Sequence, residues 1–210
     1  MNRRDALKNL TMSLGYTVAA PTLLSMLNSC TTKAETWIPK FLSEIEKNII
    51  THLVDIILPA SDTPGALDVN IPQFIDLMYN DMEKESNQKR LKKGGELFAS
   101  KFKSTFNTDA SEGKREDFET LLGSYFNVSK AEEKEILKQQ KLSLNKISTD
   151  SLDNYSVYKF LISIRYYTLF GYFTSEEIGE NILNYDPIPG SYQGCISIND
   201  VPNERAWSLP

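Results

Sequence analysis

Residues 155–173 read YSVYKFLISIRYYTLFGYF and carry the strongest structural signal in the chain. Apolar side chains fall on nearly every side of a helix with about 3.6 residues per turn, which predicts a long helix at the centre of a core. The aromatic residues could instead form a platform for substrate stacking, but at helical spacing they more often pack in a core. Lys159 and Arg165 interrupt the stretch, so it is not expected to span a membrane.

Helical signals flank this stretch on both sides. Helices are expected over residues 41–58, 71–83, 91–106 and 118–125, from 129 onward, and over 174–183. The buried face of the first is predicted from apolar residues at every fourth position, Ile45, Ile49, Leu53 and Ile57. Capping boxes at Ser129–Glu132 and Thr174–Glu177 are expected to open the last two of these helices.

Two glycines and the absence of strand signals complete the prediction of fold class. Gly94 and Gly95 fall inside the third helix, where they either weaken it or allow close packing. No segment shows an alternation of Val, Ile or Thr long enough for a sheet. The sequence therefore predicts an all-α protein with one irregular helical domain over residues 37–183.

A long arm without periodicity follows, over residues 184–210. Prolines and glycines recur through it, so neither helix nor strand is expected. It is nevertheless too apolar for a solvated tail, because it holds tyrosine, tryptophan and several isoleucines. We expect the arm to lie along a surface, either that of its own domain or that of a partner.

The N-terminus resembles an export signal over residues 1–29. Arg3 and Arg4 precede a diluted apolar stretch that contains Pro21, a pattern typical of twin-arginine export rather than of a membrane anchor. Cys30 follows Leu-Asn-Ser, as in a bacterial lipobox, and residues 30–36 are small and polar like a tether. We expect export to the periplasmic side and a lipid anchor on Cys30. The alternative is an ordinary amphipathic first helix.

Composition limits the partners and the disulfides. The chain has 28 acidic and 23 basic residues and a net charge of −5, so nucleic acid is not expected as a partner. With Cys30 lipidated, Cys195 stands alone, and it is expected to be a small buried apolar residue. If cleavage occurs elsewhere, a Cys30–Cys195 bridge becomes available.

Signatures of catalysis and of cofactor binding are missing from the sequence. There is no GxGxxG for a dinucleotide, no CxxCH for haem and no set of four cysteines for an iron–sulfur cluster, so no cofactor is expected in this chain. His52 is the single histidine and is expected to be a half-buried or exposed structural residue; a hydrolase built on it would lack a GxSxG elbow. Glu176, Glu177 and Glu180 are explained by a helix N-terminus better than by a metal.

Five motifs resemble one family. They are DTPGA at 62–66, IPQFID at 71–76, GYFTSE at 171–176, YDPIPGSYQGC at 185–195 and RAW at 205–207. Together they are similar to the gluconate 2-dehydrogenase subunit 3 family. The resemblance implies a small, cofactor-free subunit of a periplasmic FAD-dependent sugar or polyol dehydrogenase. FAD would belong to a large partner subunit, electrons would leave through a cytochrome c subunit, and the small subunit would take the flavoprotein through the Tat translocase.

Under this resemblance the arm becomes the expected partner interface. The residues assigned to it are Tyr185, Asp186, Pro187, Pro189, Gly190, Tyr192 and Trp207. Among them Tyr192 and Trp207 are expected to be the aromatic anchors. Two alternatives stay open: a free-standing periplasmic lipoprotein that binds a sugar or an envelope component, and, less favoured, a hydrolase that depends on His52.

Overall fold

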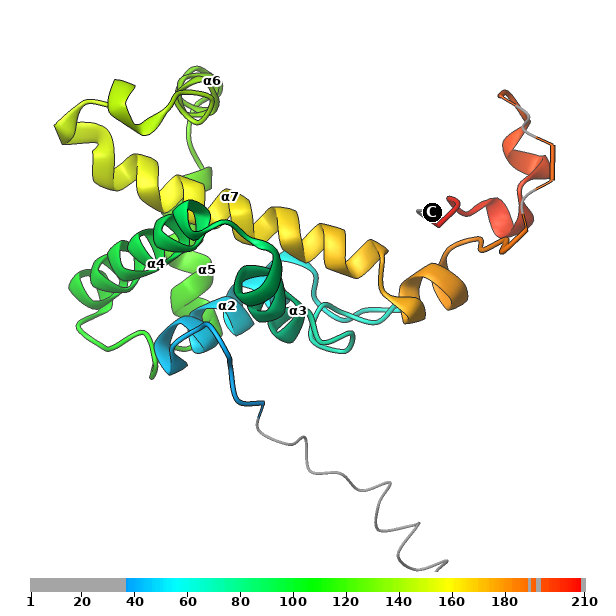
Figure 1. Ribbon diagram of the computed structural model, residues 1–210, viewed down its shortest axis with the longest axis horizontal. Coiled ribbons are helices and arrows are strands. Elements are labelled where there is room, and N and C mark those ends of the chain that lie inside the picture. The colour runs from blue at the N-terminus through cyan, green and yellow to red at the C-terminus, as the bar shows by residue number, and fades with distance from the viewer. Residues whose placement is uncertain (1–36, 189, 192–193, 209–210) are drawn as a thin grey trace, which may run out of the picture. The chain divides into compact units, whose positions relative to one another are not determined.

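The computed structural model describes residues 37–188, 190–191 and 194–208 (Figure 1). The chain divides into two units, Met1–Ile38 and Pro39–Pro210. The second unit contains α2 (Glu44–Ile57), α3 (Ile71–Leu77), α4 (Glu85–Phe106), α5 (Arg115–Phe126), α6 (Lys130–Gln139) and α7 (Leu152–Phe173). Shorter turns are η1 (Met78–Met82), η2 (Leu144–Lys146), η3 (Thr149–Ser151), η4 (Glu177–Ile182), η5 (Ile198–Asp200) and η6 (Pro202–Glu204). Within the described ranges the β-structure is limited to an isolated bridge, which confirms the all-α class.

Helix α7 lies at the centre of the domain, as its sequence predicts. It packs along α4 and also contacts α2 and α3 (Figure 1). Its buried side chains include Tyr155, Tyr158, Phe160, Leu161, Ile164 and Tyr167. The prediction that its aromatic residues are core is wrong for Tyr166, Phe170 and Phe173, which are exposed. At about 100° per residue these three positions fall on the same side of α7.

The contact between α4 and α7 depends on a glycine. A Cβ atom placed on Gly94 would lie 2.5 Å from Cβ of Phe160 and 2.7 Å from the carbonyl oxygen of Ser156. The structure thus favours the close-packing role over the weakening role for Gly94. Beside this contact Phe98 is fully buried, with its ring centroid 5.9 Å from that of Phe160 and 6.4 Å from that of Phe118.

The buried face of α2 differs from the predicted stripe. Ile49 and Leu53 are buried, but Ile45 is 42% exposed, and the face is completed by Glu46, Ile50 and Val54. At a spacing of four residues each position is rotated by about 40° from the one before, so the predicted stripe winds around the helix and Ile45, at its start, falls outside the buried face. A capping box between Ser43 and Glu46, which the sequence analysis did not single out, opens this helix.

Two helix boundaries also differ from prediction. The second helix changes after Leu77 into the π-helical turn η1. The capping box at Thr174 is wrong, because the Thr174 hydroxyl donates to the carbonyl oxygen of Phe170 at 2.7 Å, and the segment beyond it is the π-helical turn η4. The other predicted box is confirmed, since the Ser129 hydroxyl and the Glu132 carboxylate lie 2.7 Å apart.

A buried carboxylate fixes the start of the domain. Asp76 accepts hydrogen bonds from the backbone N–H groups of Lys40, Phe41 and Leu42 at 2.8, 2.9 and 2.9 Å. These bonds satisfy both carboxylate oxygens and tie residues 40–42 to α3. None of the helices that the structure describes has the length and apolarity needed to cross a membrane.

Candidate functional site

The C-terminal arm doubles back and closes on Asn184. The N–H of Asn184 donates to the carbonyl oxygen of Ala206 at 2.9 Å, and its own carbonyl accepts from the N–H of Ser208 at 2.8 Å. These bonds form a parallel bridge with Trp207. The Asn184 side chain adds a third bond, from Nδ2 to the carbonyl oxygen of Arg205 at 2.6 Å. Asn184 is buried, and its backbone and side chain together hold the two ends of the loop.

The returning end of the arm packs against η4. The guanidinium of Arg205 donates to the carbonyl oxygen of Ile182 at 3.1 Å. Gly179 is buried, and a Cβ atom placed on it would lie 3.9 Å from Cβ of Ser208. Between the two ends the chain forms the turns η5 and η6, with Asn203 and Glu204 at φ values of 53° and 52°. The arm is thus a closed loop whose base is attached to the domain through η4.

The side chains assigned to the partner interface point in large part to solvent. Tyr185 is 52% and Trp207 is 49% exposed, and Asp186, Pro187 and Gly190 are exposed as well. The assignments of Pro189, Tyr192, Arg3, Arg4 and Cys30 lie outside the described residues. Sequence reasoning missed Asn184, whose role becomes visible only when residues 205–208 return to it.

The apolar residues between the two ends of the arm are also uncovered. Ile188 is 85% exposed, and Ile196 and Ile198 are exposed too. Cys195 is a free, exposed thiol, so the expectation that it would be buried is wrong. The physical reason is the shape of the arm, since a single loop has no second layer of its own to cover small apolar side chains.

A second uncovered surface joins α3 to α7. The rings of Tyr166 and Phe170 are stacked, with centroids 6.0 Å apart and planes 3° apart. Phe74 of α3 lies beside them, its centroid 6.1 Å from that of Phe170. It reaches this position because Gly171 has no side chain, and a Cβ atom there would lie 2.5 Å from the Phe74 ring. Exposed Phe173 extends this aromatic surface toward the arm.

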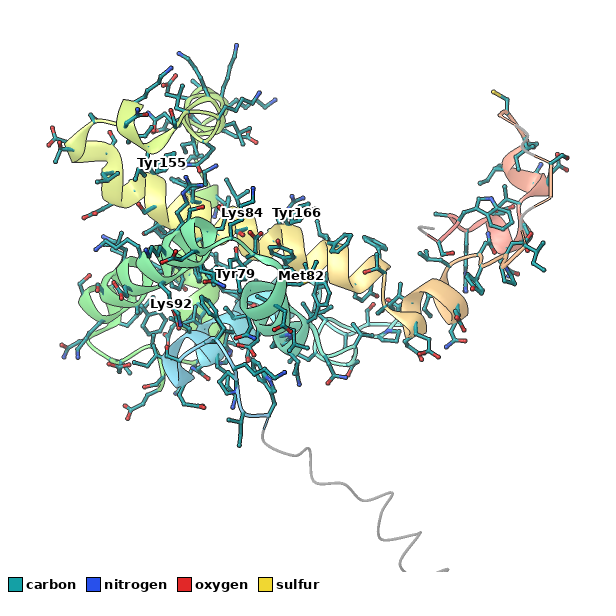
Figure 2. The ribbon with its side chains drawn as sticks, in the orientation of Figure 1. Tyr79, Met82, Lys84, Lys92, Tyr155 and Tyr166 are labelled. Atoms are coloured by element: carbon teal, nitrogen blue, oxygen red, sulfur yellow. The ribbon has the colours of Figure 1, made fainter. Side chains whose placement is uncertain are left out.

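A polar cluster borders the aromatic surface where η1 and α4 meet α7 (Figure 2). The hydroxyl of Tyr167 donates to Glu83, and Nδ2 of Asn87 donates to the other Glu83 oxygen at 2.6 Å. The hydroxyls of Tyr79 and Ser163 are hydrogen-bonded to each other. These side chains line a cavity of about 330 Å³.

The pKa shifts in this cluster favour a structural role. Burial raises the pKa of Tyr79 to about 12, against the hydrogen bond with Ser163. Burial and the bond to Glu83 also raise the pKa of Tyr167. Burial opposes ionisation of Glu83, but the hydrogen bonds from Tyr167 and Asn87 lower its pKa overall. At neutral pH both phenols therefore keep their protons and Glu83 stays ionised, so the cluster is unsuited to proton transfer.

The remaining candidates for chemistry lie apart. His52 is half-buried and stacks on Phe118 with centroids 4.6 Å apart, and burial followed by the charge of Arg115 lowers its pKa. The side chain of Glu177 accepts a hydrogen bond from Asn181 at 3.1 Å. Across the part of the chain that the structure describes, no three His, Cys, Asp or Glu side chains gather closely enough to hold a metal ion.

Comparison with known proteins gives one result. A family model described as Gluconate 2-dehydrogenase subunit 3 matches residues 44–190, which is more than half of the chain. The matched range runs from the start of α2 into the arm. No curated protein and no solved structure matches the chain.

Proposed function

This chain belongs to the gluconate 2-dehydrogenase subunit 3 family, and from that premise we propose that it is the non-catalytic small subunit of a periplasmic FAD-dependent sugar or polyol dehydrogenase. In this proposal it supports twin-arginine export and assembly of the flavoprotein large subunit. A lipid on Cys30 holds the complex at a membrane, and electrons leave through a cytochrome c subunit.

The closed arm is the observation that carries this proposal. Hydrogen bonds from Asn184 and Arg205 hold the base of the arm, while the side chains of Tyr185, Ile188 and Trp207 remain exposed to solvent. Aromatic and aliphatic side chains on a preformed loop are the usual anchors of a protein interface, because little conformational entropy is lost when they are buried by a partner.

The fold supports placing the flavin in the partner. A dinucleotide pyrophosphate is normally received by a strand, a glycine-rich turn and a helix N-terminus. In the described ranges the structure builds helices and turns without such a strand.

The proposal is tested by co-expressing this chain with the flavoprotein whose gene lies nearest to its own, and by purifying the product through a tag on this chain. The expected product is a yellow complex of the two subunits. A colourless monomer recovered from cells that make both proteins would contradict the proposal. Saturable sugar binding by that monomer would then favour the free-standing lipoprotein.

The role of the arm is tested by a matched pair of aromatic substitutions. Trp207→Ala is expected to reduce recovery of the flavoprotein strongly, since interface tryptophans commonly contribute about 2 kcal/mol or more to binding. Phe126→Ala on α5 is the control, because Phe126 has the same 49% exposure as Trp207 but lies away from the arm. Equal recovery of the flavoprotein with both variants would show that the arm is not part of the interface.

The export role is tested by replacing Arg3 and Arg4 with lysine. Both subunits should then remain in the cytoplasm, as followed by fractionation and immunoblotting. Retention of this chain alone, with the flavoprotein still exported, would show that it is not the carrier.

A further inference from the structure

A groove runs between α4 and α7 and carries an unusual charge. It consists of two cavities of about 330 and 370 Å³ that share Arg90 of α4 and Lys159 of α7 in their walls. Lys93 lines the second cavity, one helical turn beyond Arg90. We call this feature the α4–α7 groove.

The three cations of the groove have no acidic partner in the described part of the chain. Arg90 donates to the amide oxygen of Asn87 at 3.3 Å, and Lys159 donates to the carbonyl oxygen of Gln140 at 2.7 Å, both neutral acceptors. The salt bridges that α4 does form use other lysines: Lys89 with Glu85 at 2.7 Å, Lys92 with Glu46 at 2.5 Å and Lys103 with Asp109 at 3.6 Å. Asp153 lines one end of the groove but is not paired with these cations.

Lys159 is disfavoured as a cation in this position, first by its burial and then by the nearby Arg90. Burial and the nearby charge of Arg90 lower the pKa of Lys159. Glu83, the carboxylate at the other end, is already hydrogen-bonded by Tyr167 and Asn87. Apart from Lys89, which is paired with Glu85, three cations line the groove against two carboxylates, Glu83 and Asp153. The groove therefore keeps a net positive charge although the chain carries −5, and an anionic guest would stabilise it.

One end of the groove is largely apolar, and the other combines an exposed aromatic ring with the polar cluster around Glu83. Leu144, Leu152 and Tyr155 line the end near the start of α7. Tyr166 lines the other end, where it is exposed and stacks on Phe170. A guest that fills the groove would therefore place its negative charge near Arg90 and Lys159 and apolar side chains against Leu144, Leu152 and Tyr155.

We infer that the α4–α7 groove docks a segment of the dehydrogenase large subunit that carries carboxylates next to apolar side chains. Tyr155 and Tyr166 lie well apart along α7 (Figure 2), about 16 Å at 1.5 Å per helical residue. This length suits a short helix or an extended peptide laid between two helices. The inference rests on the proposed function and adds a second contact surface to the arm.

A charge-reversal experiment tests the groove. Arg90→Glu, Lys93→Glu and Lys159→Glu are combined, and the affinity for the purified flavoprotein is measured by titration at several salt concentrations. The triple variant is expected to bind about 10- to 100-fold more weakly and to lose most of the salt dependence of binding. The control combines Lys101→Glu, Lys130→Glu and Lys134→Glu, which change the net charge equally but lie outside the groove; it should bind as the unmodified chain does.

The outcomes separate this inference from the proposed function. If the unmodified chain and both triple variants bind the flavoprotein equally, the groove is not a docking site, while the proposed function stands. If both triple variants bind equally weakly, net charge alone is responsible and the inference is also overturned. If the unmodified chain binds no flavoprotein, the proposed function fails and the groove inference fails with it.

Circular dichroism and thermal unfolding verify that each variant is folded. A milder double variant, Arg90→Gln with Lys159→Gln, is also expected to weaken binding.

Discussion

The helical core and the C-terminal arm are built from similar residues but held in opposite ways. In the core two 22-residue helices, α4 and α7, approach through Gly94 and bury Phe98 and Phe160. In the arm the aromatic and aliphatic side chains stay exposed, and the loop is held by hydrogen bonds to Asn184. Apolar residues thus stabilise the chain in one region and remain available to a partner in the other.

The energies of the two kinds of contact explain this division. Burying a phenylalanine side chain contributes roughly 1.5–3 kcal/mol, and many such residues act together in the core. A hydrogen bond contributes about 0.5–1.5 kcal/mol net, and the arm has only a few at its base. The stability of the domain should therefore be nearly independent of the arm, while partner binding should depend on it.

The largest expected effect comes from the centre of the core. Phe98→Ala should lower the free energy of unfolding by about 3–5 kcal/mol, because it removes contacts with Phe118 and Phe160 and leaves a cavity. Trp207→Ala deletes a larger side chain from the arm, but it should change the free energy of unfolding by less than about 0.5 kcal/mol. Urea unfolding measures both. Equal losses would abolish the contrast between the two regions.

The approach of α4 to α7 gives the next largest effect, through two adjacent glycines. Gly94→Ala should lower the free energy of unfolding by about 1–3 kcal/mol, because its Cβ atom would meet Phe160 at 2.5 Å. Gly95→Ala meets its neighbours at ordinary contact distances of 3.5–3.7 Å and should raise it by up to about 1 kcal/mol through helix propensity. Thermal unfolding of the two variants should give shifts of opposite sign; shifts of the same sign would mean that Gly94 does not set the helix separation.

The core was largely predictable from sequence, because its signals are local. The apolar stretch at 155–173 predicted the central helix, and Ser129–Glu132 predicted a helix start that the structure confirms. The exposed face of α7 was not predictable in this way. The sequence shows that Tyr166 and Phe170 are aromatic. Whether another element covers these rings depends on the packing of α3 and α4, which the sequence alone does not give.

The arm was predictable in kind but not in shape. Its prolines and glycines predicted neither helix nor strand, and in its described residues the structure has only the short turns η5 and η6 and the isolated bridge. Its closure depends on Asn184 meeting residues 205–208, a contact between positions distant in sequence. Single polar residues of this kind have no periodic pattern to reveal them. The same reason applies to Cys195, which is exposed because no second layer of structure covers this part of the arm.

A more local effect is expected at the base of the arm. Asn184→Ala removes the hydrogen bond to the carbonyl of Arg205 but leaves the helices untouched. The amide of Ser208, which donates to the Asn184 carbonyl, should then exchange with solvent about tenfold faster, while global stability stays within about 0.5 kcal/mol. Asn199→Ala, in an exposed turn of the same arm, should leave that exchange unchanged. A global loss of stability in Asn184→Ala would show that the arm belongs to the core.

The smallest expected effect concerns His52, which belongs to the core side of the comparison. Burial, followed by the charge of Arg115, lowers its pKa in the folded chain below the ordinary value of 6.5. As the pH falls below about 6.5, the unfolded chain therefore binds more protons at His52 than the folded chain does. The stability contributed by neutral His52 is complete above that pH and is lost as the pH falls through the pKa of the folded chain. Between pH 7.5 and 5.5 the Tm of the unmodified chain should fall more than that of His52→Gln, by an amount on the order of 1 °C, because solvent screens a half-buried ring. Parallel pH profiles for the two proteins would mean that the Phe118 stack accepts the charged imidazole as readily as water does.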